Sequence, residues 1–451
     1  MRCLQLLILA LLVPANVSLV NPRQVALKVL SSPKKTNVNV DFLSELKTPS
    51  DRNLCTNLIQ TANRRSGQID AIIDRYAEKR PKKLVLAGLK LGITQIHFLS
   101  TPPHAAIHET LEALKTFKEI SKPQINFVNA VLRAADRGKE GEGEVLGNDV
   151  LNLSDFIAGS IESDWGAEVL ENVARVYSRH SGGVSLTCRD SVEDFSKELS
   201  KREVEHVVGD LGSIYVKNPG SIKRLPGFES GLFWVQDASA ALPAIILRNG
   251  ISQISQNTET PPFVIDVCSA PGGKAMQMGS WGWDVEGVEL VEKRAKRMCE
   301  NIERCKLEKN VKVVVADASQ HNFERPPVGF LLDAPCSATG TGRKNVDVMR
   351  RQNGAQMEAE LIETTKSIWS NCLTWGAKVA VFSTCSLSEA EGEKQVNWIL
   401  GKGEVRIDMI KEEEVPGFAD SIDVRGCLRV FPDDTSPGGR DGFFICRFIF
   451  E

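Results

Sequence analysis

Apolar residues recur at two different spacings in this chain, and the two spacings predict two kinds of domain. Between residues 21 and 138 they recur three and four positions apart, as on one face of a helix. The segments with this spacing are 22–30, 50–59, 69–76, 84–99, 104–118 and 125–135, and Thr101-Pro102-Pro103 ends the fourth of them. Residues 21–138 are therefore predicted to form an all-α domain.

Beyond residue 262 the apolar residues stand instead in short runs that are mostly apolar and rich in β-branched side chains. These runs are 263–267, 285–288, 311–315, 329–332 and 379–382, and 443–448 reads as a last strand. Buried parallel strands have this appearance, and helical segments separate most of the runs. We therefore expect a doubly wound, Rossmann-like α/β domain over residues 231–451.

The region between the two domains has a mixed pattern. Residues 139–149 are rich in Gly and Glu and are expected to be a linker. Residues 150–230 are expected to form a small α/β subdomain with helices over 153–178 and 192–201 and strands over 184–187 and 214–216. A polar insert over 249–262 is predicted to be a disordered surface loop.

Residues 1–20 carry one positive charge followed by an apolar core. Arg2 precedes the run 4–13, which is apolar except for Gln5. Such a segment resembles a secretory signal and is too short to span a bilayer. Three interpretations stay open: the first part of a plastid-routing signal, an atypical organellar presequence, or an incorrectly assigned start. A plastid or mitochondrion is favoured over the cytoplasm, and no stable membrane association is expected.

Charge is distributed unevenly along the chain. Residues 21–138 hold 19 Lys and Arg against 10 Asp and Glu, whereas residues 139–451 hold 35 against 48. A basic module on an acidic body favours a polyanionic partner for the module, although a well-solvated helical domain would have the same balance. Candidate phosphate contacts are Arg64, Arg65, Arg80, Lys82 and Lys83.

The 11 cysteines form no CxxC pair and have no regular spacing. This argues against a disulfide framework and against a zinc site. His104 and His108 stand four apart on one predicted helix, but no acid or third ligand accompanies them, so a structural role is favoured. No metal is expected.

The first three parallel strands are followed by acidic and small residues. The first strand leads into Asp266-Val267-Cys268-Ser269-Ala270-Pro271-Gly272-Gly273-Lys274, whose two glycines allow close backbone approach. This is neither a GxGxxG nor a Walker sequence, which disfavours a dinucleotide or ATP. Glu289 and Asp317 follow the second and third strands. Acids at these strand ends suit a cofactor that carries a nucleoside, although a single such acid is more often a helix cap.

Two cysteines follow the fourth and fifth strands. Cys336 lies in Asp333-Ala334-Pro335-Cys336, and Cys385 lies in Ser383-Thr384-Cys385-Ser386. A lone cysteine is usually a small buried hydrophobe, but two beside the cofactor end of one sheet favour covalent catalysis. A thiolate that adds to C6 of a pyrimidine makes C5 nucleophilic, and C5 can then take a methyl group from S-adenosylmethionine.

Several further stretches complete a known pattern. They are 225–228 (LPGF), 235–239 (VQDAS), 441–444 (DGFF), 102–106 with 109–110, and 127–133 (FVNAVLR), besides 266–274, 333–340 and 383–386. Together they resemble the RNA cytosine-5 methyltransferases of the Fmu/Sun class, and most closely the type of the bacterial 16S ribosomal RNA methyltransferase B, which carries a fused NusB-like RNA-binding domain. The resemblance spans most of residues 21–451.

The resemblance implies a role for each motif residue. Cys385 would attack C6 of a flipped cytosine, Cys336 would assist release of the enzyme, and Asp333 would contact the ring near N3. S-adenosylmethionine would be wrapped by Cys268, Ser269, Ala270, Pro271, Gly272, Gly273 and Lys274, with Asp333 close by, and held by Glu289 at its ribose and Asp317 at its adenine. Residues 150–230 would help to recognise the RNA.

The chain departs from the family pattern at three places. Glu289 stands where the family usually has Asp, and a longer carboxylate still reaches a ribose diol. Gly392 follows Glu391 where Asn is common, and residues 343–347 read RKNVD in place of Arg-His-Pro-Asp. We expect the last two to affect how the substrate is positioned, or which base is the target, and to leave the thiols in place.

The sequence thus predicts a monomeric enzyme that forms 5-methylcytosine in RNA, with small-subunit ribosomal RNA as the expected substrate. Two alternatives stay open. In the first, Cys336 is the attacking thiol, as the Pro-Cys thiol is in DNA cytosine-5 methyltransferases, although the basic module and the second thiol argue against that arrangement here. A non-catalytic ribosome-assembly factor would keep the fold, although retention of Cys336, Cys385 and Asp333 argues against it.

Overall fold

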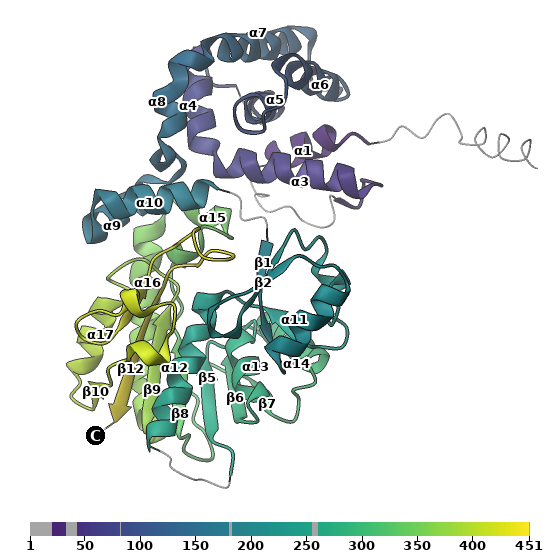
Figure 1. Cartoon of the computed structure of the whole chain (residues 1–451). Coiled ribbons are helices and arrows are strands. Elements are labelled where there is room, and N and C mark those ends of the chain that lie inside the picture. The colour runs from purple at the N-terminus through teal and green to yellow at the C-terminus, as the bar shows by residue number, and fades with distance from the viewer. Residues whose placement is uncertain (1–19, 33–42, 82, 180–182, 255–259, 451) are drawn as a thin grey trace, which may run out of the picture. The chain divides into compact units, whose positions relative to one another are not determined.

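The computed structural model describes residues 20–32, 43–81, 83–179, 183–254 and 260–450. It divides into two compact units, Met1–Asn152 and Leu153–Glu451 (Figure 1). All but the last residue of the signal-like segment, and residues 255–259 of the predicted surface loop, lie outside the described residues. Across the described part of the chain, no helix is both long and apolar enough to cross a bilayer.

Unit 1 is all-helical, as the spacing of its apolar residues predicts. Its elements are α1 Pro22–Leu30, α3 Pro49–Arg64, α4 Ser66–Tyr76, α5 Lys83–Ile93, the π-helix η1 Thr94–Phe98, α6 Pro103–Lys115 and α7 Lys122–Gly138. Helix α3 begins earlier than expected, because Thr48 accepts a hydrogen bond from Asp51 N and acts as its N-cap. Helix α5 is buried over most of its surface and contacts α1, α3, α4, α6 and α7, so it forms the centre of the unit.

Residues 139–149, expected to be a linker, are folded onto unit 1. They form the 3₁₀ helix Lys139–Glu142, helix α8 Gly143–Gly147 and the start of the 3₁₀ helix Asp149–Asn152. Gln68 donates hydrogen bonds to the carbonyls of Val145 (3.2 Å) and Leu146 (2.9 Å), and Arg65 pairs with Asp149 at 2.5 Å. These long-range contacts, which local composition does not reveal, explain why the Gly- and Glu-rich stretch is ordered.

The arginines proposed as phosphate contacts have protein partners. Arg80 pairs with Asp70 at 2.5 Å, Arg65 pairs with Asp149, and Arg64 is 5% exposed. Arg64 is therefore buried in unit 1, whereas the side chains of Arg65 and Arg80 are partly exposed beside their partners, and a phosphate contact by these two stays a prediction. Lys83 is exposed and remains a candidate, and Lys82 lies outside the described residues.

Unit 2 begins with two helices where one was predicted over 153–178. Helix α9 spans Asp155–Trp165 and helix α10 spans Ala167–Ser178. Gly166 separates them at φ +84°, a conformation that glycine adopts without steric cost. The chain therefore reverses at Gly166 and forms a helical hairpin.

A small antiparallel sheet follows the hairpin. Its strands are β1 Gly183–Cys188, β2 His206–Val208, β3 Ile214–Lys217 and β4 Phe233–Val235, in the order β2-β3-β1-β4. Helix α11, Val192–Lys201, packs on it through Phe195 and Leu199. The expected boundary at residue 230 is too early for this sheet, because β4 pairs with β1 and completes it.

The main sheet of unit 2 has parallel strands in the order β9-β8-β5-β6-β7. Their bounds are Phe263–Val267 (β5), Asp284–Glu289 (β6), Val311–Val315 (β7), Gly329–Asp333 (β8) and Val379–Thr384 (β9). The edge beyond β9 is antiparallel and was not predicted in full: it holds β12 Phe443–Phe450, β10 Val405–Ile407 and β11 Leu428–Val430. This mixed sheet confirms the Rossmann-like α/β class.

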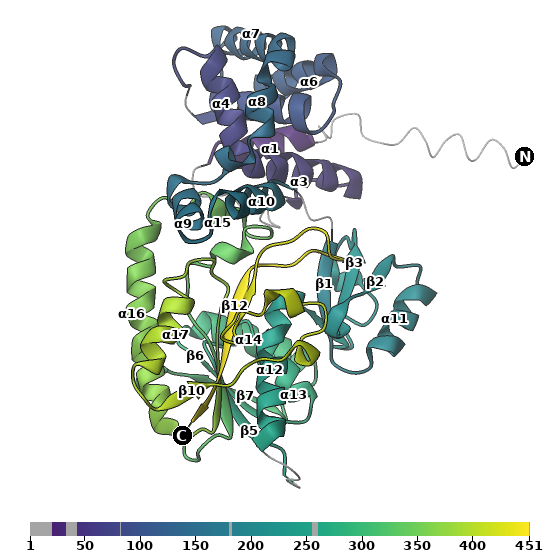
Figure 2. The same cartoon turned by 60° about the vertical axis from the view of Figure 1, so that its left-hand side comes forward.

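Helices cover both faces of the main sheet (Figure 2). Helices α12 Ala238–Ile254, α13 Gly273–Ser280 and α14 Glu292–Arg304 share one apolar core, and α16 Gly354–Cys372 and α17 Glu393–Leu400 share the other. Residues 249–254, expected in a loop, are the last residues of α12. The short elements are α15 Val346–Met349 and the 3₁₀ helices Asp210–Gly212, Ile222–Arg224, Thr339–Thr341, Leu373–Trp375, Glu412–Glu414 and Ala419–Ser421.

Candidate active site

The parallel strands bring the predicted site residues to one edge of the main sheet. Asp333 and Ser383 are directly paired at the ends of β8 and β9, and the two cysteines follow a few residues later. We call residues 334–342 the Cys336 loop and residues 385–391 the Cys385 loop. Neighbouring parallel strands end side by side, so the loops that leave them must meet.

The two thiols are in contact. The Sγ atoms of Cys336 and Cys385 lie 3.5 Å apart, and both side chains are half-buried. The hydrogen bond to Cys336 and burial raise the pKa of the Cys385 thiol well above its usual range. In the resting protein Cys385 is therefore a neutral thiol, and it must lose a proton before it attacks.

Backbone contacts fix the two loops against each other. Gly340 N donates to Cys385 O at 2.8 Å, and Gly340 O accepts from Gly442 N at 2.8 Å. A side chain at position 340 would place its Cβ 2.3 Å from the Gly442 carbonyl oxygen. Glycine is therefore required here because three chain segments meet at this point.

Asp333 lies between a cation and a hydroxyl. Its Oδ2 is 2.6 Å from Lys274 Nζ, and its Oδ1 accepts a hydrogen bond from Ser383 Oγ at 3.0 Å. Burial alone would lower the pKa of Lys274, but the charges of Asp333 and Asp266 outweigh burial and raise it. Lys274 was expected only to wrap the cofactor. Its ammonium group also links the cofactor loop, residues 268–274, to the acid beside the thiols.

A buried carboxylate supports the Cys336 loop from the other side. Glu391 is 4% exposed and accepts hydrogen bonds from Ser337 N (2.8 Å) and Ser337 Oγ (2.5 Å). Burial raises the pKa of Glu391. From the sequence, Glu391 was noted only as part of a departure from the family pattern. Its short spacing from Cys385 was the one signal that could have predicted its contact with the Cys336 loop.

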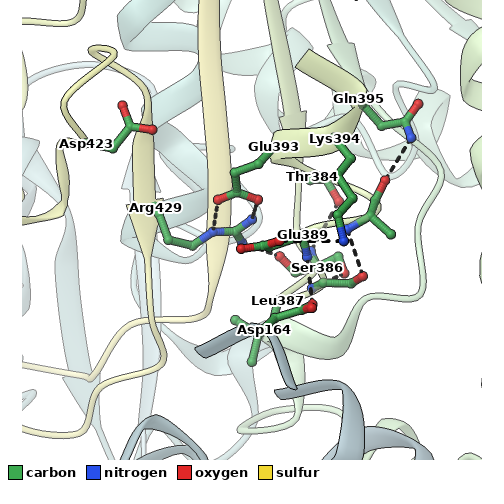
Figure 3. Close-up of polar contacts among 12 residues, drawn as sticks. Asp164, Thr384, Ser386, Leu387, Glu389, Glu393, Lys394, Gln395, Asp423 and Arg429 are labelled. Carbon is green, nitrogen blue, oxygen red and sulfur yellow. Dashed lines mark hydrogen bonds and ion pairs between the residues drawn. The ribbon is translucent and has the colours of Figure 1, made fainter. Parts of the chain in front are cut away.

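The structure explains why glycine follows Glu391. A Cβ at Gly392 would lie 2.5 Å from an Nη atom of Arg429. Arg429 fills that space, pairs with Glu393 at 2.6 Å and donates to Ser386 O at 2.6 Å (Figure 3). The arginine thus binds the Cys385 loop and occupies the space that a side chain at position 392 would need.

A cluster of four charged residues joins three of the sequence motifs. Arg343 contacts Asp237 at 3.1 Å and Asp441 at 3.3 Å, and Lys344 contacts both carboxylates. Burial acts to raise the pKa of Asp237, but the charges of Lys344 and Arg343 outweigh it and lower the pKa. The divergent sequence at 343–347 therefore keeps two cations, directly after the Cys336 loop, that bind Asp237 just before α12 and Asp441 just before β12.

The cofactor loop leaves β5 through an acid with little solvent contact. Asp266 is 1% exposed, its Oδ2 accepts from Ser269 Oγ at 2.5 Å, and burial raises its pKa to about 7. Cys268 follows at φ +60°, and burial raises the pKa of its thiol to about 12. Cys268 is therefore an inert thiol that shapes the loop.

The end of β6 presents the features that a nucleoside requires. Glu289 is 2% exposed, and its Oε1 accepts from Val291 N at 2.9 Å. Its Oε2 is buried and has no hydrogen-bond partner among the described residues, so it can accept from a ribose hydroxyl. Leu290, Val291 and Val315 are large exposed apolar side chains next to it, as a flat ring would need.

Asp317 lies two residues beyond β7 and is exposed. Its Oδ1 accepts from Ser319 N (2.9 Å) and Ser319 Oγ (2.7 Å), so this oxygen fixes a local turn. The structure therefore places Asp317 at the cofactor edge with one oxygen engaged.

The structure contains a histidine pair but no cluster that would bind a metal, within the residues that it describes. No group of three or more His, Cys, Asp or Glu side chains there has the required arrangement. The rings of His104 and His108 are stacked on α6 with their centroids 6.4 Å apart.

Comparison with known families matches both parts of the chain. Residues 254–449 match the family model described as 16S rRNA methyltransferase RsmB/F, and residues 20–137 match the model of the NusB family. The two matches cover the main sheet with its site and the helical unit 1, respectively.

Similar proteins align with this chain over nearly their whole length. The chain is 27% identical to a probable ribosomal RNA small subunit methyltransferase B of Synechocystis, over 95% of this chain and 99% of that protein. It is 28% identical to ribosomal RNA small subunit methyltransferase B of Pseudomonas syringae, over 95% and 97%. A crystal structure of PH0851 shares the fold with a TM-score of 0.74 at 19% identity, over 95% of this chain and 99% of that one.

Proposed function

Since the chain belongs to the RsmB/F family of 16S rRNA methyltransferases and carries an N-terminal NusB domain, we propose that its two cysteine loops form the catalytic centre of an rRNA cytosine-5 methyltransferase. The observation that carries this proposal is the 3.5 Å contact between Cys336 and Cys385 beside Asp333. Two thiols and an acid at one sheet edge suit covalent activation of a cytosine.

S-adenosylmethionine is the cofactor of this family, and the residues present fit it. Glu289 would hold the ribose through its buried Oε2, and the exposed apolar residues after β6 and β7 would cover the adenine. The loop from Cys268 to Lys274 would surround the methionine part, and Asp317 would contact the adenine edge. When bound, the cofactor supplies an electrophilic methyl group.

The protein side of the reaction follows from the thiol pair. Cys385 loses its proton and adds to C6 of the cytosine, and the electron density gained at C5 makes that carbon nucleophilic. Asp333, held between Lys274 and Ser383, would contact the ring near N3, and the Lys274 ammonium group beside it would stabilise the negative charge that attack at C6 spreads to N3. After methylation, loss of the C5 proton and of the Cys385 thiolate restores the aromatic ring.

Cys336 serves the last step in this scheme. Its Sγ lies next to that of Cys385, so it would reach the same base and assist removal of the C5 proton and release of the enzyme. The reverse assignment, with Cys336 as the attacking thiol, predicts the opposite phenotypes for the two cysteine variants.

The substrate is ribosomal RNA, and we infer that a single chain performs the reaction. All the catalytic groups named above come from unit 2 of one chain. Sedimentation of the active protein checks this inference, and a dimer that loses activity on dilution would contradict it.

Purified protein, S-adenosylmethionine and 16S rRNA lacking 5-methylcytosine provide the test. Cys385→Ala should abolish methyl transfer, and Cys336→Ala should accumulate a covalent protein–RNA complex that survives denaturing electrophoresis. Cys299→Ala, at an exposed position of α14, is the matched control and should keep full activity. Full activity of Cys385→Ala would overturn the assignment, and cofactor binding without any methyl transfer by the wild type would favour an assembly factor.

A further inference from the structure

Helices α9 and α10 contact both cysteine loops, although their sequence carries no recognised motif. The hairpin lies N-terminal to the small sheet, far in sequence from either cysteine. Ser154, the N-cap of α9, donates to Arg351 O at 2.7 Å, and its backbone N donates to Met349 O at 2.7 Å. The start of the hairpin is therefore fixed to the segment that follows the Cys336 loop.

Tyr177, near the end of α10, contacts the Cys336 loop. It is fully buried, and its hydroxyl donates to Thr339 O at 2.5 Å. A Cβ at Gly342 would lie 2.4 Å from the Tyr177 ring, so the ring occupies the space beside the backbone of that loop. Both the hydroxyl and the ring of Tyr177 thus define where residues 339–342 lie.

Thr339 connects this contact to the other loop. Its Oγ1 accepts from Leu387 N at 2.8 Å and lies 3.1 Å from Ser386 Oγ. The residue that Tyr177 holds by its carbonyl is therefore the residue whose side chain binds the Cys385 loop.

Asp164 and Trp165, at the end of α9, contact the Cys385 loop directly. Asp164 Oδ2 accepts from Glu389 N at 3.0 Å (Figure 3), and Trp165 Nε1 donates to Leu387 O at 2.6 Å. The Trp165 ring also packs edge-on against Phe431 with centroids 5.2 Å apart. Neighbouring backbone groups of one loop are thus bound by neighbouring side chains of one helix end.

We propose that Tyr177, Asp164 and Trp165 are positioning residues for methyl transfer, which hold the two cysteine loops in the register that the reaction needs. The inference rests on the proposed function, because it assumes that both thiols act on one base. Attack and release must then occur at the same ring, so a displacement of one loop by about 1 Å would slow the reaction by about 100-fold.

Tyr177→Phe tests the proposal, because it removes the hydroxyl and keeps the ring. We expect the single-turnover rate constant, at saturating RNA and cofactor, to fall at least ~10-fold. The KM for S-adenosylmethionine should stay within about twofold, because the hydrogen bonds described above lead to the cysteine loops and not to the cofactor loop. A second variant, Trp165→Phe, removes the indole N–H from a half-buried position and should show the same split even if Tyr177→Phe folds poorly.

A merely structural role would give a different result. It would lower the amplitude of the single turnover, because less protein would be folded, and leave the rate constant of the folded fraction unchanged. In the Cys336→Ala background, a positioning role also predicts slower formation of the covalent complex. Tyr215→Phe, which removes a hydroxyl from the small sheet, is the matched control and should retain the wild-type rate constant.

The measurements distinguish a wrong function from a wrong role of Tyr177 and Trp165. If the proposed function is wrong, the wild-type protein forms neither 5-methylcytosine nor a covalent complex. If only the present inference is wrong, the wild type is active and both variants share its rate constant. A parallel loss of cofactor affinity in both variants would also overturn it.

Discussion

Asp266 should make the stability of unit 2 depend on pH in a way that a single substitution abolishes. Its side chain is buried at the end of β5, and burial raises its pKa from 3.8 to about 7. An acid with a folded pKa above its unfolded pKa binds more protons in the folded state. Its contribution to stability is therefore complete below pH 3.8 and is lost as pH rises through the interval to about 7.

The magnitude follows from the two pKa values. A difference of one in pKa corresponds to about 1.4 kcal/mol, so linkage predicts a loss of about 3 kcal/mol between pH 5 and pH 8 from this group alone. Asp266→Asn keeps an acceptor for Ser269 Oγ and removes the charge. Relative to the wild type, the variant should therefore gain about 3 kcal/mol over the same interval.

Urea unfolding followed by tryptophan fluorescence measures this difference. All 7 tryptophans lie in unit 2, so the signal reports this unit and not the helical unit 1. The free energy of unfolding should be determined without cofactor at pH 5, 6, 7 and 8. Asp284→Asn, at a half-exposed position of β6, is the control and should leave the slope unchanged.

A constant offset between wild type and Asp266→Asn from pH 5 to pH 8 would refute this reasoning. It would show that Asp266 ionises in the folded protein as it does in water. A slope of opposite sign would mean that Lys274 and the Ser269 hydroxyl outweigh burial.

Three further predictions concern the site. Lys274→Met removes a cation that lowers the pKa of the Cys385 thiol, so the pH–rate profile of methyl transfer should move to higher pH. The rate at neutral pH should fall about tenfold for each pH unit that the profile moves, and an unchanged profile would contradict this. Glu289→Gln should weaken S-adenosylmethionine binding about 10- to 100-fold in calorimetry, through loss of a charged acceptor, and unchanged affinity would exclude it as the ribose ligand. Gly340→Ala forces apart backbone atoms of the two loops, so it should lower the free energy of unfolding in urea by about 1–3 kcal/mol. It should also reduce the single-turnover rate more than the cofactor affinity, and wild-type values for stability and rate would contradict the described packing.

The parallel part of the sheet was predictable because its strands are buried on both faces. Their short, mostly apolar runs give the positions of the strands, with the ends correct to within two residues. Since loops at the carboxyl ends of neighbouring strands meet, the sequence also placed Cys336, Cys385 and Asp333 together. The resemblance to a known family supplied their separate roles.

Other parts of the site depend on contacts that no local pattern encodes. Tyr177 and Trp165 act through hydrogen bonds to backbone carbonyls, which leave no trace in the sequence of the partner. Lys274 was assigned to the cofactor from its loop, but the direction of its side chain depends on a strand 59 residues away. The antiparallel edge was missed in part because β10 and β11 are three residues long, too short to show a period.

The position of β12 has a consequence for how this protein is made. Strand β9, which leads directly into the Cys385 loop, is buried along its whole length between β8 and β12. During synthesis β9 emerges some 60 residues before β12, so until residues 443–450 follow, it is an open, apolar sheet edge. Gly442, which contacts Gly340, arrives with β12. A nascent chain that stalls between these strands would thus expose an aggregation-prone sheet edge. Its two cysteine loops would also lack the contact at Gly442, so the stalled chain would be inactive as well as prone to aggregate.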